Sequence, residues 1–411
     1  MKLLSLKLLP FIILLSGPPA FRKMSVTTNI VEANIDIWII IQIIAYFTAF
    51  YLMIKNMPKN IHYNRDTYDV IIFLTLISLF ISSLLSNEIV TSLAYTFLYF
   101  IGIYSYYYSK NIFQDLNNQN ILSIYELIRN VFFILLLIVI FLNIFTNGYV
   151  ATESRISGGR IVNVLIICPL IFLISLYMII IGSKNFLNKV CLIISACMIF
   201  FAYSRSTWWS TIFFTFMILC KVFYLDNENK SDNFRKRSIF YFFIFFLIVL
   251  TLIYFSEIIN FLTRGQKDPF SLSGRDLISY WVFDQMNDNL FGYGLGTGFK
   301  RIFPTLIGVF DQYGLDAKSI GTAHNAYLQI LVEGGWISFV CYILLTIFPI
   351  LYFIKNIKKL INSNFFLLFI IFLFLISNNL INASSVMPSY ATFGLFWFIL
   401  SLINIHIRKK I

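Results

Sequence analysis

Residues 161–181 read "IVNVLIICPLIFLISLYMIII", a run without a single charged side chain. An α-helix rises about 1.5 Å per residue, so about 20 such residues cross a hydrocarbon core of roughly 30 Å. The run is also too long for a strand of a membrane barrel, which needs only about 10 residues. The stretch therefore predicts a transmembrane helix.

The same kind of run recurs along the whole chain of 411 residues, of which only 12% are charged. Soluble domains carry about 25% charged residues, and the mean hydropathy here is +0.81. We therefore predict an all-α polytopic membrane protein with about 12 transmembrane helices. The apolar segments lie near 3–20, 35–54, 69–85, 89–108, 127–145, 161–181, 190–203, 207–224, 238–256, 336–354, 365–380 and 391–405.

The first segment, 3–20, allows a second interpretation. It has a basic start, a short apolar stretch and small residues near its end, so a cleaved signal peptide is the alternative to a first span. Lys7 and Pro10 interrupt its apolar part, which favours the span. The orientation of the later segments is the same in both cases.

The distribution of Lys and Arg predicts that both termini are cytoplasmic. Nineteen of the 31 basic residues then fall in cytoplasmic segments, and six of the eleven outside ones lie in one long loop. Long loops cross the membrane largely regardless of charge. The net charge of +12 is thereby explained without nucleic acid, which we do not expect as a partner.

The long loop, 257–335, divides the chain into helices 1–9 (1–256), a periplasmic loop, and helices 10–12 (336–411). Loops of this length are usually functional or disordered. Spacing predicts a helix over 274–286 within it, on the outer membrane face. The "GYGLGTG" that follows lacks a preceding strand, so it predicts a tight turn and not a dinucleotide site.

The five cysteines all lie in apolar runs and show no ligand spacing. The chain also lacks an Asp-x-Asp pair and a His-x-x-x-His pair. The sequence therefore predicts neither a metal site nor a disulfide framework.

Three ionisable residues converge on the predicted outer face. Arg205 follows a predicted span in "SRST", where it is either a snorkelling anchor or a phosphate ligand. Arg275 precedes the predicted surface helix and either pairs with a nearby aspartate or binds an anion at the helix start. His324, in "TAHNAYLQILVEGG" (322–335), is either a capping residue or a proton acceptor.

Taken together, "SRSTWW", then "SGRDLISYWVFDQMNDNLFGYGLGTGF", then "AHNAYLQILVEGG" resemble the bacterial O-antigen ligase/polymerase superfamily. The ordered motifs cover about residues 200–340, and the earlier spans match only in hydropathy. The resemblance implies a GT-C-like helical fold and a metal-independent glycosyltransferase without a cofactor. It implies a location in the bacterial inner (plasma) membrane, with the active site on the periplasmic side.

The resemblance also implies substrates and roles. The donor would be a glycan on undecaprenyl diphosphate within the membrane lipid, and the acceptor another saccharide. Arg205 and Arg275 would bind the diphosphate, and His324 would orient or deprotonate the acceptor hydroxyl. Asn325, Tyr280 and Trp281 would contact the substrates, although aromatic residues at the interface also have a general anchoring role.

Within this resemblance the motifs favour a polymerase of O-antigen or capsule-type repeat units, with a chain-length regulator protein as a conceivable partner. The alternative is an O-antigen ligase that joins the glycan to lipid A–core. A lipid-linked oligosaccharide flippase is the alternative from another class, but the spans carry few ionisable residues, which transporters usually need. A membrane scaffold with a partner-binding loop is a further alternative.

Overall fold

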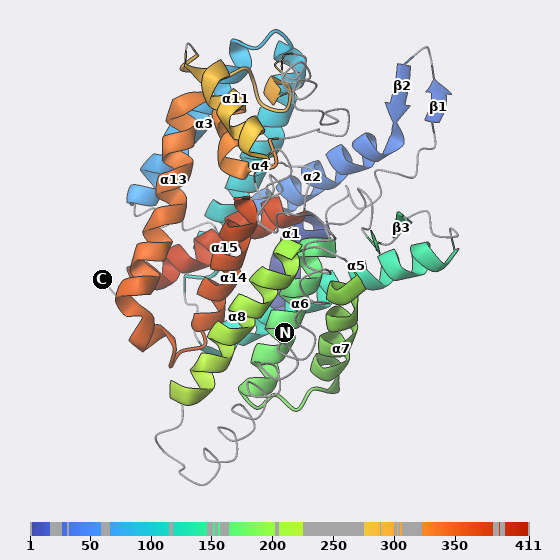
Figure 1. Ribbon diagram of the computed structural model, residues 1–411, viewed down its shortest axis with the longest axis vertical. Helices are drawn as coiled ribbons and strands as arrows, with labels where there is room; N and C mark the ends of the chain where they lie inside the picture. The colour runs from blue at the N-terminus through green and yellow to red at the C-terminus, as the bar shows by residue number, and fades with distance from the viewer. Residues whose placement is uncertain are drawn as a thin grey trace.

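The computed structural model describes residues 2–16, 27–30, 33–58, 66–114, 118–145, 151–152, 155–156, 164–201, 205–224, 275–287, 289–299, 302, 305, 323–380, 386 and 391–409. Twelve helices occur among these residues (Figure 1). They are α1 (Lys2–Ser16), α2 (Ile37–Lys55), α3 (Thr67–Leu84), α4 (Ile89–Ile112), α5 (Asn118–Phe145), α6 (Val164–Ile180), α7 (Phe186–Phe201), α8 (Arg205–Tyr224), α11 (Arg275–Met286), α13 (Ala326–Leu360), α14 (Phe366–Asn379) and α15 (Ala391–Arg408).

The predicted helical class is confirmed, and the protein is a membrane protein by the apolar character of its helices. Four helical stretches are long and apolar enough to cross a bilayer: 67–84, 89–112, 120–141 and 326–360. Five shorter apolar helices accompany them in the described part of the chain. The predicted segment 238–256 lies outside the described residues, and the count of 12 spans stays a prediction.

Two small antiparallel hairpins, which the sequence did not indicate, lie beside the helices. One pairs β1 (Thr27–Ile30) with β2 (Ala33–Asp36), and the other pairs β3 (Ala151–Thr152) with β4 (Arg155–Ile156). Both fall in segments that the topology assigns to the outside.

The core of the bundle is formed around α14 and α15, whose described side chains are buried almost all round. A helix that is apolar on every face belongs in such an interior. Close approach of α4 to α15 depends on Gly102, because a Cβ there would lie 2.2 Å from the Phe393 ring. By contrast, Phe73 of α3 and Ile354 of α13 are more than half exposed, as expected for side chains that face lipid.

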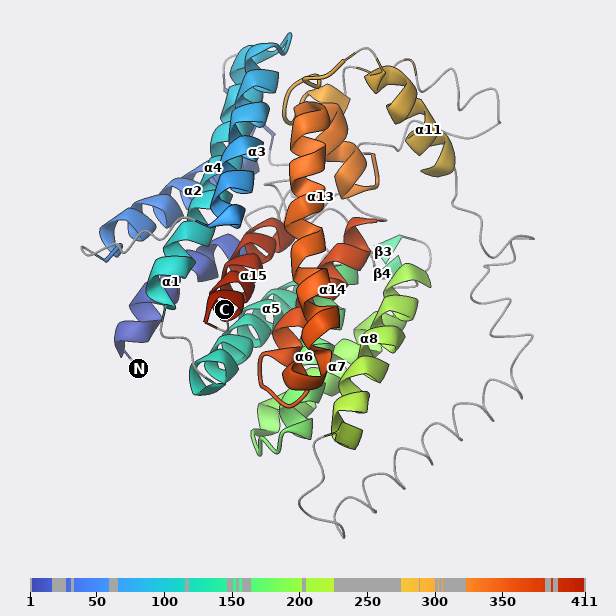
Figure 2. The same ribbon diagram turned by 90° about the vertical axis from the view of Figure 1, so that its left-hand side faces the viewer.

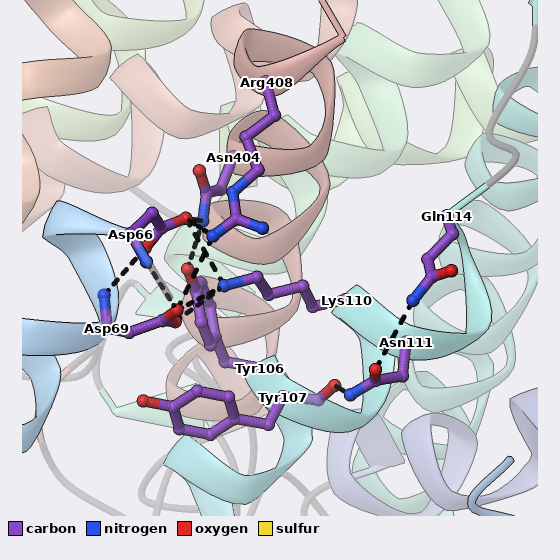
Figure 3. A network of polar contacts seen from close by, with 9 residues as sticks. All are labelled: Asp66, Asp69, Tyr106, Tyr107, Lys110, Asn111, Gln114, Asn404 and Arg408. Atoms are coloured by element: carbon purple, nitrogen blue, oxygen red, sulfur yellow. Dashed lines mark hydrogen bonds and ion pairs between the residues drawn. The ribbon is translucent and has the colours of Figure 1, made fainter. Parts of the chain in front are cut away.

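A compact ionic network joins the ends of α3, α4 and α15 (Figure 3). Asp66 caps α3 and forms a capping box with Asp69. Lys110 lies 2.7 Å from Asp69 and 3.3 Å from Asp66. Arg408 contacts Asp66, and Asn404 donates to the same carboxylate over 2.7 Å. The network joins α15, near the end of the sequence, to the consecutive helices α3 and α4.

A second buried cation joins α8 and α6 to the turn between α13 and α14. Lys221 is 1% exposed, and its Nζ donates to the Tyr177 hydroxyl over 2.8 Å and to the Ser363 carbonyl over 2.7 Å. Lys110, Arg408 and Lys221 all lie on segment ends that the predicted topology assigns to the cytoplasm. Their partners lie on the side that the same topology calls cytoplasmic: Asp66 for Lys110 and Arg408, and Ser363 for Lys221.

The ionic network predicts acid sensitivity. Burial by itself raises the pKa of Asp66, but the hydrogen bond from Asn404, the Asp69 amide and the charges of Lys110 and Arg408 together hold that pKa below its ordinary value. A carboxyl with a lowered folded pKa stabilises the fold above its unfolded pKa of about 3.9 and loses this contribution as the pH falls through the folded pKa. The Tm of the wild-type protein should therefore fall as the pH is lowered below about 4.

Thermal unfolding in detergent between pH 7 and pH 3 checks this expectation. Asp66→Asn should be less stable than wild type at pH 7 and should lose less Tm on acidification. Asp284→Asn is the matched control, because the Asp284 side chain is exposed, and it should follow the wild-type curve. If Asp66→Asn loses as much Tm as wild type over this range, the interpretation is wrong.

Candidate active site

Residues 326–334 of the segment "AHNAYLQILVEGG" form the first part of α13, which consists of a short and a long helical part. Gly335 interrupts it with φ 78° and ψ −177°, values that lie outside the helical region. The amide of Trp336 donates to the Leu290 carbonyl over 3.0 Å instead of continuing the helix. The short part, 326–334, lies beside the upper end of the long part (Figure 2). The structure has a break in the helix at the predicted boundary between loop and span, 335/336. That the membrane begins there stays a prediction.

The glycine-rich turn docks against this break. Gly292, Gly294 and Gly296 all have positive φ, so the predicted tight turn is confirmed. The amide of Tyr293 donates to the Val332 carbonyl over 2.8 Å, and that of Gly294 to the Glu333 carbonyl over 3.1 Å. The turn therefore pairs its backbone with the last turn of the short helix.

A buried group of hydroxyl side chains from α3 and α4 supports the same place. Ser82 donates to the Glu333 carbonyl and accepts from the Gly294 amide over 3.1 Å. Ser78 donates to the Gly334 carbonyl over 3.0 Å. Ser83 bonds to Ser92 and Thr96, and Ser86, between α3 and α4, bonds to Thr297 of the turn. Sequence reasoning missed this group, although its signal was a series of Ser and Thr in otherwise apolar helices.

His324 lies immediately before α13, half-buried, with φ 50°. It has the one positive φ among the described non-glycine residues. Left-handed backbone in a non-glycine residue is uncommon and is stabilised only when the surroundings fix it. The conformation turns the chain sharply at the predicted proton acceptor.

Asn325 caps the helix that follows His324. Its side-chain oxygen accepts from the amides of Tyr327 and Leu328 over 2.9 and 3.2 Å. Its Nδ2 donates to the Leu380 carbonyl, over 3.2 Å, just after α14. The structure therefore gives Asn325 a capping and anchoring role, and its predicted contact with substrate stays a prediction.

The two aromatic residues predicted to contact the substrates differ in the exposure of their side chains. Tyr280 is 78% exposed, whereas Trp281 is 4% exposed and packs edge-on to Phe299. The indole N–H of Trp281 donates to the Thr305 hydroxyl over 3.0 Å. Trp281 thus stabilises the packing of α11, and its burial presents no open ring face to a sugar in this conformation.

The helix predicted over 274–286 is confirmed as α11. Arg275 is its first residue, and Arg205 is the first residue of α8. The side chains of both arginines lie outside the described residues, so their distances to His324 stay untested. The backbone nevertheless shows which helix ends are neighbours.

The start of α8 lies near the end of α14. Lys221 in the last turn of α8 contacts the turn before α14, and the Phe214 and Phe374 rings are 5.8 Å apart halfway along. The two helices therefore run in opposite directions. At about 1.5 Å per residue, Arg205 lies about 13 Å along α8 from Phe214, and Leu380 lies about 9 Å along α14 from Phe374. Both distances run in the same direction. Leu380 is the residue that accepts from Asn325.

Helix α11 packs on the short helix of α13. A small buried cluster contains Ile278 and Trp281 from α11, Ala323 directly before His324, and Leu328 and Leu331 from the short helix. Arg205 and Arg275 are thus the first residues of helices that pack on α14 and on the first part of α13, respectively, and His324 lies two residues before α13. No group of three His, Cys, Asp or Glu side chains able to hold a metal occurs in the described part of the chain.

Comparison with known families covers the segments that carry these residues. A family model described as O-antigen ligase matches residues 190–343, which is less than half of the chain but contains most of α7, all of α8 and α11, and the first half of α13. The predicted resemblance to the O-antigen ligase/polymerase superfamily is thereby confirmed. Neither the curated proteins nor the solved structures that were compared gave a match.

Proposed function

Because residues 190–343 carry the segment characteristic of O-antigen ligases and polymerases, we propose that this chain is a glycosyltransferase for O-antigen or capsule-type glycans. It transfers a glycan from undecaprenyl diphosphate to a saccharide hydroxyl on the periplasmic side of the inner membrane. The favoured activity is polymerisation of repeat units. The observation that carries the proposal is the family match over residues 190–343. It is supported by the packing of α8 on α14 and of α11 on the short helix of α13, and by the hydrogen bond from Asn325 to the end of α14.

The chemistry needs a site for a leaving diphosphate. The acceptor hydroxyl oxygen bonds to the anomeric carbon, and the bond from that carbon to the diphosphate oxygen breaks. Undecaprenyl diphosphate leaves with the electron pair and gains negative charge. Arg205 and Arg275 stabilise that charge as fixed cations, and the guanidinium group offers paired donors that match phosphate oxygens.

The acceptor hydroxyl must also lose its proton. The imidazole of His324 takes it as the new bond forms. The starts of α8 and α11 would favour the bound diphosphate further, because the first-turn amides of a helix carry partial positive charge. Tyr280, which is exposed, is available to stack on a sugar ring.

A ligase is the second candidate, because the matching family model is described as O-antigen ligase. The two reactions share the donor and the leaving group and differ only in the acceptor. A polymerase elongates a lipid-linked glycan, whereas a ligase uses lipid A–core. The residue roles proposed above are the same for both.

Expression in a strain that lacks the gene tests the proposal. Wild type should restore long surface glycan on a gel, and Arg205→Ala, Arg275→Ala and His324→Ala should each fail to do so at normal protein levels. Loss of long chains with single repeats still on lipid A–core indicates a polymerase. Loss of all surface attachment, with lipid-linked polymer accumulating, indicates a ligase. A wild-type glycan pattern from all three variants would refute the residue roles.

A further inference from the structure

We propose that Gln329 is a positioning residue for His324 and that Glu333 fixes the orientation of the Gln329 side-chain amide. The inference rests on the proposed function, because it assigns a partner to the residue that would take the proton. Neither residue touches the reacting atoms in this proposal. Both act by holding the backbone on which His324 stands.

The contacts form a short buried chain. The amide N–H of Ala323 donates to Oε1 of Gln329 over 2.9 Å, and Nε2 of Gln329 donates to Oε1 of Glu333 over 2.7 Å. Gln329 is 1% exposed, Ala323 2% and Glu333 5%. Gln329 and Glu333 are four residues apart, so they share one face of the short helix.

The order of these contacts fixes the side-chain amide of Gln329. The backbone N–H of Ala323 can only donate, so it requires the carbonyl end of the Gln329 amide, and the NH₂ end then donates to Glu333. A flipped amide would leave two buried mismatches, each of which is unfavourable.

His324 therefore lies between two anchors on the same short helix. Gln329 holds residue 323 on one side, and Asn325 caps the helix on the other. A left-handed residue persists when its neighbours are fixed in this way. The anchors restrict where the imidazole can go, and accurate placement of a reacting group contributes strongly to rate.

The far end of this chain is also held. The backbone carbonyl of Glu333 accepts from Ser82 and from the Gly294 amide. The glycine-rich turn is thereby connected to the backbone at His324 through residues 333, 329 and 323. A change at the break at Gly335 would therefore reach the backbone at His324 through these contacts.

Single-turnover and steady-state transfer by purified full-length variants test the inference. Gln329→Leu keeps the size of the side chain but removes both hydrogen bonds. Its kcat should fall about a hundredfold while KM for the lipid-linked donor changes little. Glu333→Gln keeps an acceptor oxygen for Gln329 and should retain most activity, whereas Glu333→Leu should lose about as much as Gln329→Leu.

Two further variants separate positioning from general damage. Asn188 of α7 carries another buried side-chain amide, which donates to the Ser183 hydroxyl over 3.0 Å. Asn188→Leu removes this amide and should leave kcat unchanged. In the His324→Ala background, Gln329→Leu should cause no additional loss, because both changes act through the same imidazole. Additive losses in that background would overturn the positioning role.

The remaining outcomes distinguish this inference from the proposed function. If His324→Ala abolishes transfer and Gln329→Leu is as active as wild type, the positioning role is wrong and the proposed function stands. If His324→Ala transfers at the wild-type rate, the proposed role of His324 fails and this inference fails with it. If Gln329→Leu does not accumulate, the comparison of Glu333→Gln with Glu333→Leu decides the question, and equal kcat for these two would overturn it.

Discussion

Gly335→Ala is expected to prevent accumulation of folded protein. Its backbone, at φ 78° and ψ −177°, lies in a region that is essentially restricted to glycine, where strain amounts to about 1–3 kcal/mol. A Cβ at this position would lie 2.3 Å from the Leu290 carbonyl oxygen and 2.6 Å from the Phe291 carbonyl carbon. These are backbone atoms, so no side chain can rotate away. The strain and the overlap together are a large fraction of a typical folding free energy of roughly 5–15 kcal/mol.

Gly182→Ala provides the matched control. Gly182 also has a positive φ, of 90°, but nothing lies within 4 Å of an added Cβ. This variant should show only the backbone strain, about 1 kcal/mol, and accumulate nearly as well as wild type. Size-exclusion profiles of detergent extracts, before and after heating, check both variants. Equal recovery of the Gly335→Ala and Gly182→Ala proteins would contradict the described break in α13.

His324→Ala is expected to lower the rate of glycan transfer by about 10²- to 10⁴-fold, the usual contribution of a positioned acid or base. His324 is half-buried two residues before α13, between Ala323, which packs with α11, and Asn325, which bonds to the end of α14. Binding of the lipid-linked donor should persist, because the arginines are proposed to hold the diphosphate. Initial rates and donor binding, measured on the same purified protein, check the two expectations separately.

Two other substitutions at this position separate the imidazole from the backbone. His324→Asn removes the imidazole while tolerating φ 50° better than alanine does, so it should be as inactive as His324→Ala but more stable. His324→Gln keeps a donor and an acceptor but cannot take up a proton near neutral pH. Substantial activity of His324→Gln would show that His324 orients the acceptor and does not deprotonate it.

The helices were largely predictable because hydropathy alone places a long apolar run in the membrane. Even so, the segment predicted to begin at 336 belongs to a helix that starts at Ala326. Glu333 and the pair Gly334–Gly335 lower the apolar character of the first part, so the run itself gives no sign of the short helix. The two hairpins were missed because strands of two to four residues leave almost no periodic pattern.

The long-range polar contacts could not be predicted from the sequence, for a different reason. Asn404 and Asp66 are separated by 338 residues, and Ser82 and Glu333 by 251. Such pairing depends on which helices are neighbours, which hydropathy does not specify. The site residues could be proposed because ordered motifs resembled a family. The role of Gln329 could not, since Gln and Glu four residues apart on a helix are common on solvated surfaces too.

Transfer by the purified protein in vesicles tests the central claim most directly. The vesicles would contain the undecaprenyl-diphosphate-linked repeat unit as sole glycan donor and acceptor, and the products would be separated by length. Wild-type protein should release undecaprenyl diphosphate in proportion to the longer lipid-linked glycan formed, and the His324→Ala protein should release almost none. Movement of intact lipid-linked glycan between leaflets, with no diphosphate released in the presence of either this acceptor or lipid A–core, would contradict a transferase and favour a flippase.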